Sequence, residues 1–193
     1  MSERHWVWVN EPTAEDEAMI YGVPPVIAAQ GLLFNQGHLV TQPVPLIEIE
    51  RDADSQGRLT DNLIAAGVKG LLFSTRLLEL LQSLGLENLQ HFAVLVRNPH
   101  DGTETRDYAL VNVVGRISCL DRAKSVVKHP PTDPQHIEFI ETLALDAGRI
   151  YGQDFFRLGE VPEILIASTR VKEACERARI TGVRFYAPED YLF

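Results

Sequence analysis

A segment that occurs twice limits what this chain can fold into more than any other feature of its sequence. Residues 71–92 and residues 165–186 align without a gap at a constant offset of 94. Four residues of the first copy, Ser74, Thr75, Arg76 and Glu79, recur in the second as Ser168, Thr169, Arg170 and Glu173. Both copies are built from core and helix-capping positions, and neither contains a metal cluster or a phosphate loop. We therefore interpret the repeated unit as architectural and look for the function elsewhere.

Each copy of the repeat predicts a strand, a capped helix and a second strand. The apolar runs at 71–73 and 164–167 suit buried strand ends. A Ser-Thr pair follows each run, and such residues can cap a helix. Apolar residues then recur at helical spacing, and short strands near 89–96 and 183–186 complete the units. With the turns found elsewhere, this predicts an α+β fold with a mixed sheet and two related strand–helix–strand units.

The rest of the chain gives coarser expectations. Its 193 residues, 45% of them hydrophobic, fit a single α+β domain over residues 1–193. The polar, proline-rich loop at 128–135 is the best internal boundary. Trp6 to Val9 is expected to form a strand and residues 59–66 a helix. Residues 44–49 are expected to form a strand that lies at a sheet edge or contains a bulge, because of Pro45.

Cysteine usage and charge indicate the compartment. Cys119 and Cys175 lie in apolar surroundings, which predicts buried free thiols in a reducing compartment, with a disulfide as the alternative. The beginning of the chain resembles no secretory signal, and no apolar run is long enough to span a bilayer. We therefore expect a cytoplasmic protein with no membrane partner. The formal net charge of −9 argues against nucleic acid as a partner and favours either solubility alone or a basic protein partner.

Few motifs could carry chemistry. None of the common nucleotide-binding, zinc-protease or serine-hydrolase fingerprints occurs. His129, Asp133 and His136 come nearest to a metal set, but their spacing fits no regular site, so no metal or cofactor is expected. Arg76 and Arg170 fall in the first turn of their helices, where a cation is unfavourable. Each is expected to pair with a carboxylate, and an anion site is the alternative.

Two acidic segments are the predicted partner-binding surface. The first consists of Glu15, Asp16 and Glu17, and the second of Glu48, Glu50, Asp52 and Asp54. Strand alternation places Glu48 and Glu50 on one face. A solvent-facing strand that protects a sheet edge by charge, a surface for a basic partner, and a catalytic carboxylate pair are the three interpretations.

Four segments resemble a known family. They are residues 70–77, residues 108–114 together with 119–121, residues 154–158 and residues 180–185. In this order and spacing they resemble immunity-protein family eleven of bacterial polymorphic-toxin systems, which is typified by a Myxococcus immunity protein. The Phe-Arg-Leu element at 156–158 and the Thr-Gly-Val-Arg-Phe element at 181–185 are the most specific.

The resemblance implies a non-enzymatic antitoxin. Such a protein is made beside a secreted or contact-delivered toxin, as in type VI secretion, and blocks the toxin's C-terminal domain in the cytoplasm. The toxin domain is expected to be basic near its active site, which an acidic inhibitor would exploit. The resemblance supplies no catalytic residue. Two alternative functions remain. One is a hydrolase that uses Glu48, Glu50 or Asp52 with a nearby histidine, and the other is a small-molecule-binding module.

Overall fold

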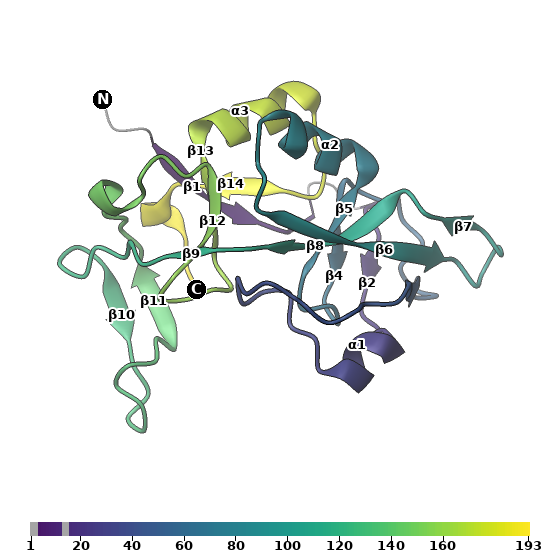
Figure 1. The fold of residues 1–193 in the computed structure, drawn as a ribbon, viewed down its shortest axis with the longest axis horizontal. Coiled ribbons are helices and arrows are strands. Elements are labelled where there is room, and N and C mark those ends of the chain that lie inside the picture. The colour runs from purple at the N-terminus through teal and green to yellow at the C-terminus, as the bar shows by residue number, and fades with distance from the viewer. Residues whose placement is uncertain (1–3, 13–15) are drawn as a thin grey trace.

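The computed structural model describes residues 4–12 and 16–193. Its strands form two larger sheets and one separate hairpin (Figure 1). The first sheet has the order β2 (Met19–Ile20), β4 (Asn62–Ala65), β5 (Leu71–Ser74), β8 (Tyr108–Val113), β6 (Leu89–Arg97) and β3 (Ile47–Glu50), and β7 (Glu104–Thr105) pairs with β6. The second has the order β14 (Arg184–Tyr186), β1 (His5–Val9), β13 (Leu165–Ser168), β12 (Phe155–Leu158) and β9 (Arg116–Ile117).

The remaining elements are a hairpin and five helical segments. The hairpin consists of β10 (Val126–Lys128) and β11 (Phe139–Thr142). The α-helices are α1 (Pro25–Gln30), α2 (Thr75–Ser83) and α3 (Thr169–Ala178), and the short 3₁₀ helices are Ala147–Arg149 and Pro188–Asp190. The segment at 128–135, which the sequence marks as a boundary, begins at the last residue of β10 and continues into the loop between β10 and β11.

The repeat extends well beyond the aligned segments. The orders β2-β4-β5-β8-β6 and β9-β12-β13-β1-β14 match strand for strand, and each neighbouring pair has the same parallel or antiparallel sense. The register matches too, because Ser74 faces Tyr108 in one half and Ser168 faces His5 in the other. The predicted α+β fold with two related units is therefore confirmed, and each unit is larger than the sequence repeat.

The two halves exchange their first strands. β1 precedes the first unit in the sequence but lies between β13 and β14 of the second sheet. β8 precedes the second unit but lies between β5 and β6 of the first sheet. Each half therefore completes the sheet of the other, which joins them more firmly than a surface contact would.

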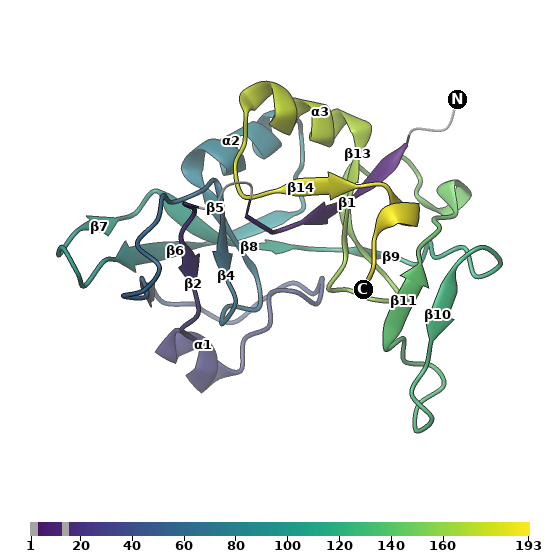
Figure 2. The same ribbon diagram turned by 180° about the vertical axis from the view of Figure 1, so that it is seen from behind.

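Both halves also share one hydrophobic core. Helices α2 and α3 contact each other and lie together on one side of the sheets (Figure 1). Trp8 packs against Phe155 and Phe73, with ring centroids 5.0 and 5.7 Å apart, and belongs to the same core cluster as Leu77 and Val171 of the two helices. The view from behind shows α1 and the β10–β11 hairpin on the side opposite α2 and α3 (Figure 2).

One predicted element is wrong and two are confirmed. Residues 59–66 do not form a helix, because Asn62–Ala65 is strand β4, which pairs antiparallel with β5. Three of its four residues are buried, so tertiary pairing decided a segment whose local pattern suits either structure. Trp6 to Val9 belongs to strand β1, as predicted. The predicted edge position of the strand at 44–49 is confirmed, since β3 is the last strand of its sheet, but β3 begins at Ile47 and Pro45 lies before it.

Candidate partner-binding surface

The repeated arginines are structural. Ser74 caps α2, since its Oγ accepts a hydrogen bond from Leu77 N at 3.1 Å, and it donates to Asp61 Oδ1 at 2.8 Å. Arg76 Nη2 lies 2.7 Å from Asp61 Oδ2. The expectation of an ion pair is confirmed in this half, because a carboxylate already occupies the place that an anion would take.

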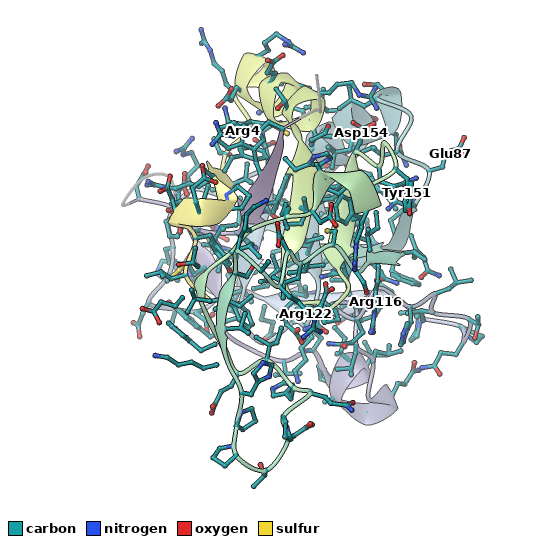
Figure 3. All side chains as sticks on the ribbon, turned by 90° about the vertical axis from the view of Figure 1, so that its left-hand side faces the viewer. Arg4, Glu87, Arg116, Arg122, Tyr151 and Asp154 are labelled. Atoms are coloured by element: carbon teal, nitrogen blue, oxygen red, sulfur yellow. The ribbon has the colours of Figure 1, made fainter. Side chains whose placement is uncertain are left out.

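The second half repeats this cluster beside the start of α3. Ser168 caps α3 through Val171 N and donates to Asp154 Oδ1 at 2.6 Å, while Arg170 pairs with Asp154. Figure 3 labels Asp154. Partial burial acts to raise the pKa of Asp154, but the hydrogen bonds from Arg170 and Ser168 outweigh it, so its pKa lies below the usual value. The same balance lowers the pKa of Asp61.

The most specific segments of the family resemblance are architectural as well. Thr181 donates to Asp61 Oδ2 from both its backbone N and its Oγ1, each at 3.0 Å, and so links the two halves. At Gly182, φ is 76°, and a Cβ there would lie 2.3 Å from the carbonyl oxygen of Asn62. Only glycine allows this approach.

Arg157, the arginine of the Phe-Arg-Leu element, lies in the interior with 1% of its surface exposed. Its guanidinium donates to the carbonyl oxygens of Val113, Pro162 and Phe34 at 3.2, 2.8 and 2.9 Å. Burial lowers its pKa to about 10, so it stays charged at neutral pH. Sequence reasoning assigned this residue only to a strand, since burial of an arginine leaves no local signal.

Four of the predicted acidic residues come together in space. Asp16, Glu17, Asp52 and Asp54 line one hollow of about 620 Å³. The residues lining the rest of this acidic hollow are Met19, Tyr21, Ser55, Gln56 and Gly57. The hollow joins the end of the first acidic segment to the loop that follows β3, although these segments are far apart in the sequence.

Hydrogen bonds hold the acidic hollow in shape. Asp52 Oδ2 and Ser55 Oγ each accept a backbone N–H from the facing segment, from Tyr21 and Met19 respectively, at 2.7 Å. Arg58 N donates to Asp16 O at 2.6 Å. These bonds fix the backbone around the carboxylates, so the hollow is already formed in the free protein.

The carboxylates of the hollow differ in exposure. The Glu17 side chain is 1% exposed, and its Oε1 lies 3.6 Å from Arg58 Nη2. The Asp16 side chain is 71% exposed, and Asp54 is exposed as well. Asp16 and Asp54 are therefore the acids of the hollow that face solvent.

The other predicted acids lie outside the hollow. Glu48 and Glu50 project outward from β3 while Ile47 and Ile49 are buried, as alternation predicted. Arg97 Nη1 donates to Glu48 Oε2 at 2.6 Å, and Arg97 also pairs with Glu104. Glu15 lies outside the described residues.

Other candidate chemistry finds little support. In residues 4–12 and 16–193, no group of three or more His, Cys, Asp or Glu side chains could hold a metal ion. His129 Nδ1 instead contacts the carbonyl oxygen of His136 at 2.7 Å. Cys119 and Cys175 are buried and free, so the disulfide alternative is wrong.

The helices of the described residues are all too short or too polar to cross a lipid bilayer. Comparison with curated proteins finds no significant match. Comparison with protein families finds one that covers most of the chain: the immunity protein family (Imm11) matches residues 18–190. This range includes the segments that carry the resemblance, helices α2 and α3, and the acidic hollow except for Asp16 and Glu17, which precede it together with strand β1. The chain therefore belongs to the Imm11 immunity protein family.

Proposed function

We propose that this protein is a cytoplasmic antitoxin that binds the C-terminal domain of a cognate bacterial toxin. It would neutralise the toxin by covering its active site or by holding it in an inactive conformation. Membership of an immunity protein family supports an antitoxin role and implies a toxin partner. We choose the acidic hollow as the toxin-binding surface because four of the predicted acidic residues line it: Asp16, Glu17, Asp52 and Asp54.

Inhibition by binding needs only a small part of the molecule. The protein exposes 10,099 Å² of surface. A standard interface takes about 800 Å² from each partner, which is less than a tenth of that area. The acidic hollow and the neighbouring strand β3, with Glu48 and Glu50, can supply such a patch.

The charge of this surface suits a basic partner. Residues 16–54 contain six acidic residues and one basic residue, Arg51, a net charge of −5 out of −9 for the whole chain. Arg58 and Arg97, which pair with Asp16, Glu17 and Glu48, bring the net charge of this surface from −5 to −3. Complementary charge accelerates encounter between proteins and disfavours wrong partners. We therefore propose that the contact face of the toxin carries lysine or arginine.

The arrangement of Glu48, Glu50 and Asp52 does not favour the alternative function, a hydrolase. Glu48 is bound to Arg97 on an open sheet edge, and Asp52 already accepts the backbone N–H of Tyr21. A general acid and base need a shared pocket that separates their pKa values. Glu48 and Glu50 do not line the hollow that contains Asp52.

Co-expression tests the proposed function. The full chain would be produced with the C-terminal domain encoded by the adjacent upstream gene, and both growth and complex formation would be measured. We expect restored growth and a stable complex. Growth arrest without a complex would contradict the antitoxin function.

A charge-reversal pair tests the acidic surface. Asp16→Lys with Asp54→Lys would be compared with Glu79→Lys and Glu87→Lys, which make the same change in net charge at exposed positions on and beside α2. The first pair should slow association at least tenfold at low salt, and the second should have a much smaller effect. Equal effects would show that only net charge matters.

A further inference from the structure

The segment between the two acidic segments contains no charge. Residues 18–47 are 30 consecutive positions without Asp, Glu, Lys or Arg. Elsewhere the longest such run is nine residues, at 88–96. A surface this poor in charge is unusual in a protein with 45 charged residues, so the segment needs a physical explanation.

Burial in the core explains only part of the absence of charged residues from this segment. Ile20, Ile27, Phe34 and Ile47 enter the core of the first half. The same segment nevertheless exposes five of the eight large hydrophobic side chains that are exposed among the described residues. They are Tyr21 at 53%, Val23 at 54%, Leu33 at 47%, Leu39 at 60% and Leu46 at 36% exposure. Apolar, charge-poor surface of this kind is typical of interface cores.

Two of these side chains share a hollow. Leu33 and Leu39 line a cavity of about 300 Å³ whose wall comes entirely from residues 30–42, none of them Asp, Glu, Lys or Arg. This uncharged hollow is at the lower end of the volumes found for small-molecule pockets, so it suits a side chain better than a metabolite. Its lining residues come from the end of α1 and the segment that follows it, and α1 lies on the side of the molecule opposite α2 and α3 (Figure 2).

The backbone around the uncharged hollow is fixed although it has no regular secondary structure. Gln90 of β6 accepts from Val40 N at 3.0 Å and donates to Val40 O at 2.6 Å. Asn112 of β8 donates to His38 O at 2.7 Å. Long irregular loops that are held in this way are often functional. A preformed surface also loses less conformational entropy on binding.

We propose that the exposed apolar side chains of residues 18–47, centred on Leu33 and Leu39, form the docking core for the toxin domain. Tyr21, one of these side chains, also lines the acidic hollow, whose carboxylates form the rim of the docking surface. The fitting partner surface has an apolar or aromatic side chain that enters the uncharged hollow and basic residues around it. This inference rests on the proposed function, because it names the surface on which the same partner binds.

Two leucines of similar exposure provide the test. Leu39 is 60% exposed and Leu192, which lies outside the segment, is 67% exposed. Leu39→Arg and Leu192→Arg would be titrated against the C-terminal domain encoded by the upstream gene, with the unaltered protein as reference. Because both positions are exposed, both variants should keep the thermal unfolding midpoint of the unaltered protein.

We expect Leu39→Arg to raise the dissociation constant at least tenfold and to abolish growth rescue, while Leu192→Arg changes neither. Leu33→Arg should act in the same direction. Unchanged binding by both Leu33→Arg and Leu39→Arg would overturn the docking surface and leave the antitoxin function standing. No complex with the unaltered protein would overturn both. Self-association that Leu39→Arg abolishes would assign the surface to a second copy of this chain and overturn the toxin as its occupant.

Discussion

His5 and Tyr108 occupy equivalent positions in the two halves, and each contacts the carbonyl oxygen just before an ion-paired aspartate. Tyr108 Oη donates to Thr60 O at 2.8 Å, and His5 Nε2 lies 3.1 Å from Gln153 O. Each residue is the first of an exchanged strand. Burial raises the pKa of Tyr108 to about 12, so its hydroxyl remains a donor across the physiological range. The exchanged strands are therefore anchored at the same point in both halves.

Acid should destabilise the protein through the two aspartate clusters. Because the pKa values of Asp61 and Asp154 are lowered in the folded state, their stabilisation is complete well above the unfolded value near 3.8 and is lost as pH falls through the folded values. Urea unfolding between pH 7 and pH 3 should show this loss, and Asp61→Asn with Asp154→Asn should reduce it. An unchanged pH dependence in the double variant would contradict the assignment.

Replacing Arg157 should lower the free energy of unfolding substantially. Arg157→Ala leaves the carbonyl oxygens of Val113, Pro162 and Phe34 without their donor in the interior. We expect the free energy of unfolding to fall by at least about 3 kcal/mol, since each unsatisfied buried group costs about 1–3 kcal/mol. Urea titration measures it. Arg122→Ala, at an exposed position, is the control and should change stability by less than about 0.5 kcal/mol.

Alanine substitutions at two glycines distinguish the cost of a left-handed backbone from the cost of a steric clash. Gly102 has φ of 72° with nothing within 4 Å of an added Cβ, whereas Gly182 has φ of 76° and a Cβ there would meet Asn62 O at 2.3 Å. Gly102→Ala should cost about 1–2 kcal/mol, the usual penalty for left-handed backbone. Gly182→Ala should cost clearly more in the same unfolding measurement. Equal costs would show that the loop at 182 can move away.

The two thiols should be inert in the folded protein. Burial raises the pKa of Cys119 and of Cys175 to about 12, and thiolates rather than thiols react. At pH 8 a thiol reagent should label neither cysteine until urea unfolds the chain, and it should then label both. Rapid labelling of either one without urea would show that its surroundings open.

Local features of this fold were predictable from the sequence, and long-range ones were not. The serine caps and the first-turn arginines follow from residue types within a few positions of each other. The partner of Arg76 is Asp61, whose place depends on the hairpin of β4 and β5, and no local pattern identifies it. Strand β4 was wrongly predicted as helix for a similar reason, because its pairing with β5 is tertiary.

The candidate surface divides in the same way. Charge alone selected Asp16 and Asp52, but the fold decides that both line one hollow. The charge-free run at 18–47 was visible in the sequence as well. Its meaning depends on which side chains stay exposed, and burial cannot be read from composition when a segment supplies core and surface residues alternately.

The strand exchange also sets when the fold can be completed. His5 pairs with Ser168, 163 residues later, and translation of that interval takes roughly 8 to 30 s. Throughout this time β1 has no partner strand, and Trp8 lacks the aromatic side chains of β12 and β14 that cover it. A chain that stops before residue 165 has every strand of the first sheet but leaves β1 unpaired and the shared core incomplete. The core that joins the two halves is therefore completed in a single step, once residues 165–186 have been made.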